Sequence, residues 1–243
     1  MVGETEQNSM FNKKGLRKHA LRDRYEDAPL SIDVELIRTD GIITDIERVE
    51  IERWLFHRAG FEKLFMISEV CPGGIFPLQT DEDGYAYYLN CRFLHPVKIE
   101  NDAGIIGYRA TLEADAPFAW VEEREYEFTL TGGSASANSA ITVRVNSDLP
   151  EYIWPRVTIQ TGNVGGNVTI VNQSDDPARL TSFSGLTNTT QVIMNGETNY
   201  ISGQNYVKFS DKNFIRLRDG LNQIIITGDV VSIKISFRNR RYL

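Results

Sequence analysis

Residues 44–66, TDIERVEIERWLFHRAGFEKLFM, contain the one strongly specified helix of this 243-residue chain. Thr44 and Glu47 have the spacing of a capping box, in which each side chain satisfies a backbone N–H of the other residue. Acidic residues in the first turn also suit the positive end of the helix dipole. The sequence therefore predicts a helix over residues 45–59, ended by Gly60 in a left-handed cap.

The same stretch indicates how this helix packs. Ile51, Trp54 and Leu55 fall at i, i+3, i+4 spacing, and we predict that they form the helix core face. Trp54→Ala is then expected to cost roughly 3–5 kcal/mol, because a buried aromatic anchor would leave a cavity. Residues 61–67 form an apolar run too short for another helix and are predicted to be a strand. We expect the helix to lie across a sheet.

The composition is that of an ordinary globular protein. With 41% hydrophobic and 24% charged residues, the chain is long enough for one large or two ordinary domains. No apolar run approaches the length of a membrane span, and the start lacks the basic-then-apolar pattern of a secretory signal. The sequence therefore predicts no membrane partner and first folding in the cytoplasm.

Charge is divided unevenly along the chain. Residues 1–146 carry 16 Lys and Arg against 25 Asp and Glu, whereas residues 147–243 carry 10 against 8. An acidic first half argues against specific nucleic-acid binding, which needs a basic surface. The one basic run, residues 13–24 (KKGLRKHALRDR), is typical of a solvated or disordered arm. We interpret residues 1–28 as a polar arm that orders only on a partner, or as an extended edge element.

Strand signals dominate the rest of the first half. Residues 30–36 alternate between apolar and polar with a period of two, and aromatic or alternating runs recur up to residue 130. The stretch TGGSASANSA, residues 131–140, is small and polar, and indicates either a flexible connector or a long hairpin tip. It is the best candidate for a boundary. We therefore predict a β-rich domain over residues 29–140, with the helix 45–59 in it.

From residue 141 the sequence changes to seven short strand-like runs with turns every eight to twelve residues. Asn195-Gly196 is the strongest hairpin signal among these turns. Strands at this spacing predict a compact β-sandwich over residues 141–243.

No catalytic or metal-binding constellation is evident. His19, His57 and His95 are isolated in the sequence, whereas general base or metal chemistry needs a partnered carboxylate or a further ligand. Cys71 and Cys91 lack metal-site or redox spacing, and we expect them to be buried free thiols. The prediction is that the protein has no catalytic residues, no cofactor and no metal, and is not an enzyme.

A few aromatic residues in the second half could instead bind a ligand. Exposed rings can stack on a sugar, although core or interface packing is the commoner role of such residues. The candidates for a sugar-stacking surface are Tyr152, Trp154, Tyr200 and Tyr206.

Several motifs, taken in their order, resemble the distal tail proteins of long-tailed, siphovirus-type bacteriophages. The resemblance covers residues 27–243, and the APFAW corner, the WPRVTI strand and the GLNQIIITG hairpin carry most of it. The motifs are PLSIDVEL (29–36), ERVEIERWLF (47–56), GFEKLF (60–65), ATLEADAPFAW (110–120), VNSDLPEYIWPRVTI (145–159) and FIRLRDGLNQIIITGDVVSIKISFRNRRYL (214–243).

This resemblance implies a mainly β fold: an N-terminal β-sandwich with one α-helix, followed by a C-terminal galectin-like β-sandwich. It implies a structural hub of a tail tip or baseplate, whose copies close into a hexameric ring. The ring would join the tail tube protein to the tail-tip or spike (tail-associated) protein, would carry receptor-binding proteins for host attachment, and would contact the tape measure protein. The genome would pass through the ring, and an acidic bore would repel it.

The implied location is the tail tip of a virion, after assembly in the host bacterial cytoplasm, and related contractile bacteriocins and gene transfer particles are alternative settings. In one departure from the family pattern, a polar, partly basic arm replaces one or two strands ahead of residue 27. No galectin sugar-binding pattern is matched. Two other functions stay open: a carbohydrate-binding module for host cell-surface adsorption, and a small glycan-cleaving enzyme with unrecognised carboxylates.

Overall fold

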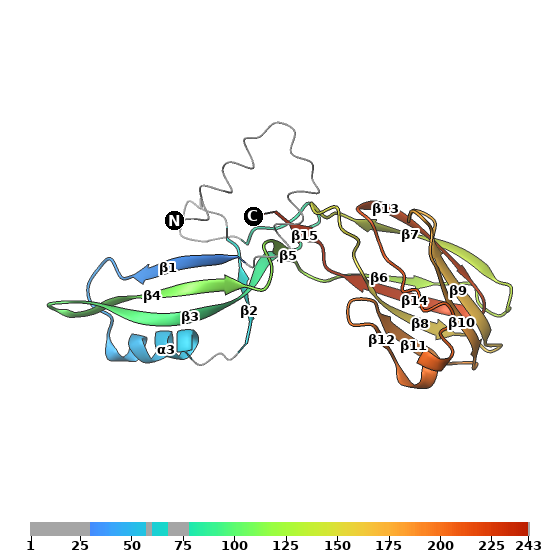
Figure 1. The fold of residues 1–243 in the computed structure, drawn as a ribbon, viewed down its shortest axis with the longest axis horizontal. Coiled ribbons are helices and arrows are strands. Elements are labelled where there is room, and N and C mark those ends of the chain that lie inside the picture. Colours follow the sequence, from blue (N-terminus) through green and yellow to red (C-terminus); the bar gives the residue numbers. More distant parts are fainter. Residues whose placement is uncertain (1–29, 57–59, 68–77, 243) are drawn as a thin grey trace, which may run out of the picture. The chain divides into compact units, whose positions relative to one another are not determined.

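The computed structural model describes residues 30–56, 60–67 and 78–242. Antiparallel strands form most of the regular structure, and the α-helix in these residues is α3 (Asp45–Phe56). A mainly β fold with one helix, as the sequence indicates, is therefore confirmed (Figure 1). The predicted arm over residues 1–28 and the last three residues of the predicted helix, 57–59, lie outside the described residues.

The chain divides into two compact units, which are described separately below. In the described residues the first unit ends at Trp120, and the second spans Val121–Arg241. The boundary therefore lies at residue 120 and not at residue 140, as the sequence suggested. The reason is strand pairing, because residues 124–129 pair with a strand close to the C-terminus of the same unit. The small polar stretch 131–140 connects two strands within that unit and does not join domains.

The first unit is built on one antiparallel sheet. Cys91 in the middle of this sheet is the partner of Glu62 on one side and of Ala114 on the other, so the strands of those two residues flank its own strand. In this unit β4 pairs with β1 and with β3, and β3 pairs in addition with β2 and with β5. The bounds are β1 (Ser31–Ile37), β2 (Glu62–Phe65), β3 (Tyr87–Asn101), β4 (Gly104–Ala114) and β5 (Ala119–Val121). The short strand β15 (Arg240–Arg241) belongs to the second unit.

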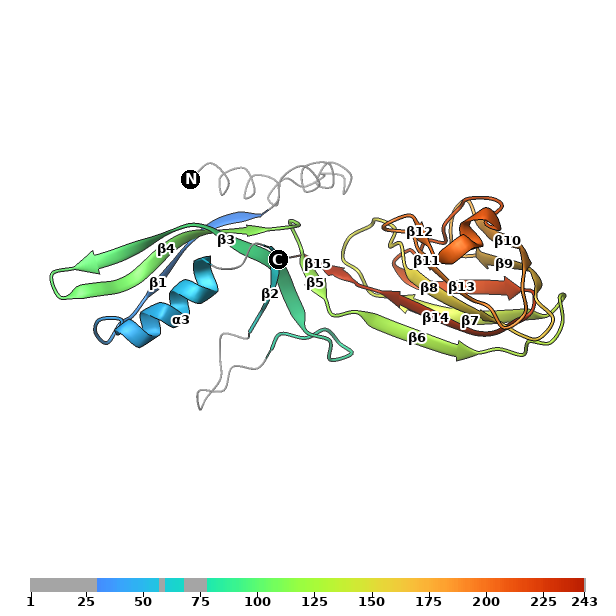
Figure 2. The same ribbon diagram turned by 90° about the horizontal axis from the view of Figure 1, so that it is seen from below.

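The two faces of this sheet differ in chemistry. One face carries cross-strand polar pairs, among them the ion pair of Glu35 with Arg109 and that of Arg92 with Glu113, at 2.6 Å. The other face is apolar and packs against α3, and Figure 2 shows the helix lying along the sheet. A second sheet was expected to complete an N-terminal β-sandwich. In the described residues, helix α3 occupies the apolar face instead.

The start of α3 has the predicted capping box. The Glu47 carboxylate accepts hydrogen bonds from the Thr44 backbone N–H at 2.9 Å and from the Thr44 hydroxyl at 2.7 Å. The Glu47 backbone N–H donates to the Thr44 Oγ1 at 3.4 Å. Arg38, just after β1, adds an ion pair with the same carboxylate. The Thr44 backbone bond, the Thr44 hydroxyl and then Arg38 lower the pKa of Glu47 to about 2.

Thr44→Ala is expected to destabilise the first unit by about 1 kcal/mol, because the helix loses its N-cap acceptor and Glu47 loses a donor. Urea unfolding of the full chain measures this cost, with Thr44→Ser as the control that keeps the hydroxyl. Glu47 has a lowered pKa, so its contribution is present above the unfolded pKa and is lost as the pH falls toward 2. The free energies of unfolding of Thr44→Ala and Thr44→Ser should therefore become equal in acid. Equal losses of stability in both variants at neutral pH would contradict the capping role.

The predicted core face of α3 is only partly buried. Leu55 is buried and Ile51 is half-buried, but Trp54 is 38% exposed and packs its ring on Phe93 at a centroid distance of 4.7 Å. Trp54 lies at the margin of the helix–sheet contact, so its truncation would leave a shallow surface depression and not a closed cavity. The cost of 3–5 kcal/mol expected for Trp54→Ala from the sequence is therefore too high.

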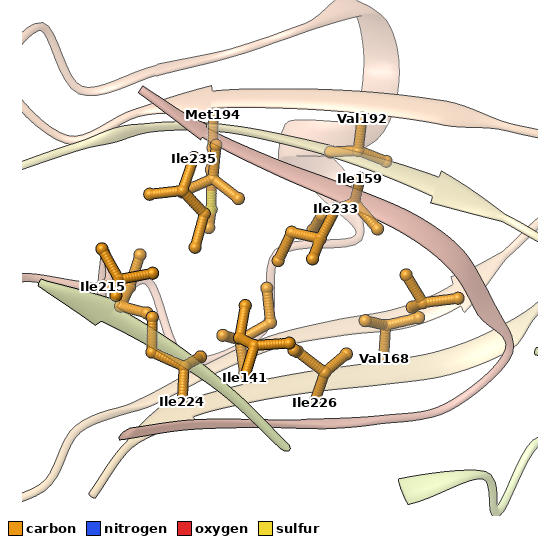
Figure 3. Packing of buried hydrophobic residues seen from close by; sticks show 14 of the residues in the cluster. Ile141, Ile159, Val168, Val192, Met194, Ile215, Ile224, Ile226, Ile233 and Ile235 are labelled. Atoms are coloured by element: carbon orange, nitrogen blue, oxygen red, sulfur yellow. The ribbon is translucent and has the colours of Figure 1, made fainter. Parts of the chain in front are cut away.

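The second unit is the predicted β-sandwich. Apolar side chains from two facing sheets interdigitate in its core, as Figure 3 shows for Ile159, Ile233 and Ile226. One sheet has the order β10-β9-β13-β7 and the other the order β12-β11-β8-β14-β6. The bounds are β6 (Arg124–Thr129), β7 (Asn138–Val145), β8 (Arg156–Thr161), β9 (Gly166–Asn172), β10 (Leu180–Leu186), β11 (Gln191–Asn195), β12 (Tyr200–Ile201), β13 (Gly220–Thr227), β14 (Val230–Phe237) and the 3-10 helix η1 (Gly203–Val207).

Candidate assembly surface

Helix α3 presents apolar residues to solvent on the side away from the sheet. Ile46 is 77% exposed and Val49 is 54% exposed, and Phe56 continues the line at i, i+3, i+10 spacing. We call these three residues the helix stripe. A single exposed apolar side chain is normal, but a helix whose outer side is apolar usually has a partner on that side.

On the side of α3 that faces the sheet, Glu52 makes polar contacts with residues of the sheet. Glu52 accepts a hydrogen bond from the Tyr108 hydroxyl at 3.0 Å and forms an ion pair with Lys98 at 3.0 Å. Burial of Tyr108 and, next, its bond to Glu52 raise the pKa of Tyr108 to about 12, whereas Lys98 and then Tyr108 lower the pKa of Glu52. The helix is thus fastened to the sheet by a polar cluster, while apolar groups remain outside.

A second apolar surface lies at the β2 edge of the same unit. β2 and the residues next to it carry four partly exposed large apolar side chains, and Ile67 and Leu78 form a β-bridge with each other. We call these residues the β2-edge patch: Phe61, Phe65, Ile67 and Leu78. This patch and the helix stripe consist of different residues on different elements, so one copy offers two unlike apolar surfaces.

A groove of about 630 Å³ lies between β1 and α3. Leu36, Ile51 and Tyr108 supply apolar wall, and Glu47 and Glu50 supply carboxylates. In the described part of the chain, β1 pairs with β4 alone, so its other edge is open beside this groove.

In the second unit, a buried carboxylate holds three loops together. Asp229 lies in the turn between β13 and β14 and has no exposed surface. Its carboxylate accepts hydrogen bonds from the backbone N–H groups of Gly133 at 2.6 Å, Val164 at 2.6 Å and Gly165 at 2.8 Å. The Gly133 bond is the largest cause of the lowered pKa of Asp229. The sequence did not point to this role, because a buried carboxylate looks the same in sequence as an exposed one.

Two of the four aromatic residues considered for sugar stacking are covered by arginines. The Arg216 guanidinium lies 3.7 Å from the Tyr152 ring centroid, and Arg179 lies 5.8 Å from that of Trp154. Arg216 is itself held by the buried Asp175. These rings are therefore part of the packing of the unit.

The other two candidate residues for sugar stacking lie in β12 and in the 3-10 helix η1 that follows it. Tyr200 and Tyr206 are both well exposed, Tyr206 at 62%. None of the ring contacts found among the described residues joins this pair to Tyr152 or Trp154. A sugar-stacking surface of Tyr152, Trp154, Tyr200 and Tyr206 therefore stays a prediction.

Of the histidines and cysteines considered in the sequence, His95 and Cys91 lie within the described residues. Cys91 is a buried free thiol whose pKa is raised by burial. His95 lies at a register shift in β3, next to Pro96, with a positive φ of 51°. His19, His57 and Cys71 lie outside the described residues. Within residues 30–56, 60–67 and 78–242, no group of three His, Cys, Asp or Glu side chains could hold a metal, and no helix is long and apolar enough to cross a membrane.

Comparison with protein families gives a match over the second unit. Residues 118–237 match a family described as "Phage tail C-terminal domain". The match begins close to the boundary at residue 120. No curated protein sequence matches the chain.

Solved structures with a similar fold include a phage hub protein. The crystal structure of the SPP1 Dit (gp 19.1) protein, titled a paradigm of the hub adsorption apparatus in phages that infect Gram-positive hosts, is 14% identical with a TM-score of 0.56, over 88% of this chain and 79% of that chain. The phage P2 baseplate in its activated conformation with Ca is 9% identical with a TM-score of 0.38, over 76% and 89%. An exo-beta-1,3-galactanase from Phanerochaete chrysosporium reaches 0.25 at 10% identity, over 73% and 57%. The last two scores are too low to support an argument.

The family match therefore relates the second unit to a C-terminal domain of phage tail proteins. Most of the chain also shares the fold of SPP1 Dit.

Proposed function

We propose that this protein is a non-enzymatic structural hub of the phage tail tip, in which copies of the first unit associate into a closed ring of six. The ring would join the tail tube protein to the tail-tip or spike protein, with receptor-binding proteins attached for host attachment and the tape measure protein in contact. The second unit, as a galectin-like sandwich, would project to these partners. Assembly would take place in the cytoplasm of the host bacterium, before incorporation at the virion tail tip.

The observation that carries the proposal is the pair of unlike apolar surfaces on the first unit. If the helix stripe of one copy packs against the β2-edge patch of the next, each contact is head-to-tail. Such contacts form a closed ring when the rotation between neighbours closes, and an open filament when it does not. Both surfaces would then be removed from water in the assembly, which accounts for their exposure in a single copy.

Mixing two interface variants tests this arrangement. Ile46→Glu/Val49→Lys changes only the helix stripe and places opposite charges at i, i+3, which the helix tolerates. Ile67→Lys/Leu78→Glu changes only the β2-edge patch and places opposite charges across a β-bridge. The wild type is expected to have a mass of six times 27.6 kDa in solution, and each variant alone the mass of one chain. An equal mixture should give pairs of chains, because one intact junction remains.

Leu221→Glu is the matched control, since Leu221 is exposed on β13 of the second unit and should not affect assembly. A wild type that stays at 27.6 kDa at high concentration would refute the ring. Folded variants that assemble like the wild type would show that the interface lies elsewhere. A mixture that yields no pairs would exclude head-to-tail contact.

A carbohydrate-binding function in host adsorption is a second candidate, and the exposure of Tyr200 and Tyr206 favours it. Stacking of a sugar on these rings would contribute about 1 kcal/mol or more per ring. Binding of the protein to cell-wall glycans on an array, lost in Tyr206→Ala and kept in Trp154→Ala, would support this function. Absence of glycan binding, together with ring formation, would leave the structural role alone.

A further inference from the structure

The strand β7 forms an open edge of the sandwich in the second unit, because in the described residues it pairs with β13 alone. The other edge of the same sheet, β10, is covered: the Ser184 N–H donates to the Lys208 carbonyl at 2.7 Å, and the Ser210 N–H donates to the Ser182 carbonyl at 3.0 Å. In the facing sheet, the edge strand β12 has two residues, and the edge strand β6 carries charged residues. Covering, short length and charge all protect an edge from pairing. The first six residues of β7 are uncharged and have none of these protections.

The hydrogen-bond pattern of the sheet shows which backbone groups of β7 point outward. Residues along an antiparallel strand point their N–H and C=O groups alternately toward one neighbour and toward the other side. The Gly228 N–H donates to the Ala137 carbonyl at 2.9 Å, so in the same alternation the odd-numbered residues of β7 face β13. The even-numbered residues, among them Ala140 and Thr142, therefore point their N–H and C=O groups into the open edge.

A row of apolar side chains crosses the outer face of this sheet and ends at β7. Each member is the cross-strand partner of the next: Leu180 on β10, Val171 on β9, Ile225 on β13 and Ala140 on β7. The residues on both sides of Ile225 are buried, so the row lies on the face away from the core. A strand added beside β7 would extend the row by one position, and an apolar side chain at that position would contact Ala140.

Arg144 adds an unpaired positive charge to the same edge. Its side chain is exposed and forms no ion pair among the described residues. Its carbonyl accepts the Tyr126 hydroxyl from the facing sheet at 3.1 Å, which ends the free part of the edge. Arg144 and Ala140 lie on the same face of β7, four positions apart, so an added strand in either direction places two of its residues at that spacing beside them. A complementary segment therefore has an apolar residue and an acidic residue four positions apart.

We propose that the open edge of β7 binds an extended segment of another protein, which adds a strand to the sheet. Main-chain hydrogen bonds to Ala140 and Thr142 provide affinity, and the side chains beside Ala140 and Arg144 provide specificity. A second copy of β7 is not the occupant, because β7 contains no acidic residue and would leave Arg144 unpaired. This proposal goes beyond the hub role and does not depend on the ring, since β7 belongs to the second unit.

Selection from a display library of random peptides, each long enough to span β7, tests the proposal with the full chain as bait. The enriched peptides should share an apolar and an acidic residue four positions apart, within a run of β-branched residues. The interface variant Ile46→Glu/Val49→Lys should bind the same peptides as the wild type, because its changes lie in the first unit. This comparison separates failure of the edge site from failure of the ring.

Variants of β7 show whether the selected peptides use the edge. Thr142→Pro removes an outward N–H that makes no bond to β13, a position where a sheet edge tolerates proline. It should weaken peptide binding by about tenfold or more, the scale of one lost hydrogen bond or somewhat above. Thr142→Val keeps the N–H and is the matched control, with binding equal to that of the wild type.

Arg144→Glu tests the charge without changing the backbone, so it remains informative if Thr142→Pro does not fold. It should weaken binding of the acidic peptides by about threefold or more, and peptides with lysine in place of the acidic residue should regain binding to this variant. Absence of enriched peptides would overturn the proposal. Peptides that bind Thr142→Pro and Arg144→Glu as tightly as the wild type would do the same, as would pairing of chains that only Thr142→Pro abolishes, because a second copy would then be the occupant.

Discussion

Asp229→Ala is expected to lower the free energy of unfolding of the second unit by about 3–5 kcal/mol, because three buried backbone donors lose the acceptor that they share. The wild-type carboxylate is buried and accepts three backbone N–H bonds from two loops, at 2.6–2.8 Å. Without it, Gly133, Val164 and Gly165 each retain a donor away from water, and each unsatisfied buried donor costs about 1–3 kcal/mol.

Asp229→Asn is the shape-matched comparison. Its single carbonyl oxygen can keep the bonds from Val164 and Gly165, but its amide nitrogen then faces the Gly133 N–H, so we expect a smaller loss than for Asp229→Ala. Glu197→Ala, at an exposed carboxylate of the same unit, should change stability by less than about 0.5 kcal/mol. Hydrogen exchange at β8 and β14, measured during urea titration, reports the stability of this unit alone. An Asp229→Ala cost below about 1 kcal/mol would contradict the assigned role.

The same carboxylate gives the unit a pH dependence. The pKa of Asp229 is lowered in the folded state, chiefly by the bond from Gly133. Its contribution is therefore complete above the unfolded pKa of about 3.9 and is lost as the pH falls through the lower folded value. The stability difference between the wild type and Asp229→Asn should be largest near neutral pH and should shrink in acid. A difference that grows in acid would mean that the folded pKa is raised instead.

Phe183→Ala should cost about 3–5 kcal/mol, because Phe183 is fully buried and its ring packs on Phe209 at a centroid distance of 5.2 Å. The second unit has facing sheets that cannot easily move together, so the deleted ring leaves a cavity. Trp54→Ala removes a larger side chain but should cost only about 1–2 kcal/mol, since much of its ring already contacts water. Urea unfolding with unit-specific hydrogen exchange compares the two variants.

Phe183→Leu is the control that keeps most of the apolar volume, and it should recover more than half of the loss. If Trp54→Ala lowered the free energy of unfolding of a monomeric chain more than Phe183→Ala does, Trp54 would be more deeply buried than its exposed fraction of 38% indicates. If Trp54→Ala became costly only under conditions of assembly, Trp54 would lie near the interface between copies.

Local sequence signals predicted local structure well. The Thr44 and Glu47 pair fixed the start of α3, because both partners of a capping box lie within one helical turn. Alternation predicted β1, and the regular turn signals after residue 141 predicted the sandwich. β3 continues through Pro96 as one strand, with a register shift between Leu94 and Val97.

Features that depend on distant residues were not predictable in the same way. Residues 131–140 have the composition of a linker, yet β6 before them and β7 after them both belong to the sandwich. The strand β10 contains serine, threonine and glycine and carries no alternation strong enough to find. Exposed and buried apolar residues also look alike in sequence, and for this reason Trp54 was expected to be an anchor and the helix stripe was not recognised.

The sequence alone determined the mainly β class, the one capped helix, the two-part organisation and the resemblance to distal tail proteins, because these follow from short-range periodicity and motif order. The tertiary structure decided where the first unit ends, which side chains of α3 meet the sheet, and that Asp229 ties three loops together. Each of these depends on strand pairing or burial between residues far apart in the chain, and such partners leave no local pattern in the sequence.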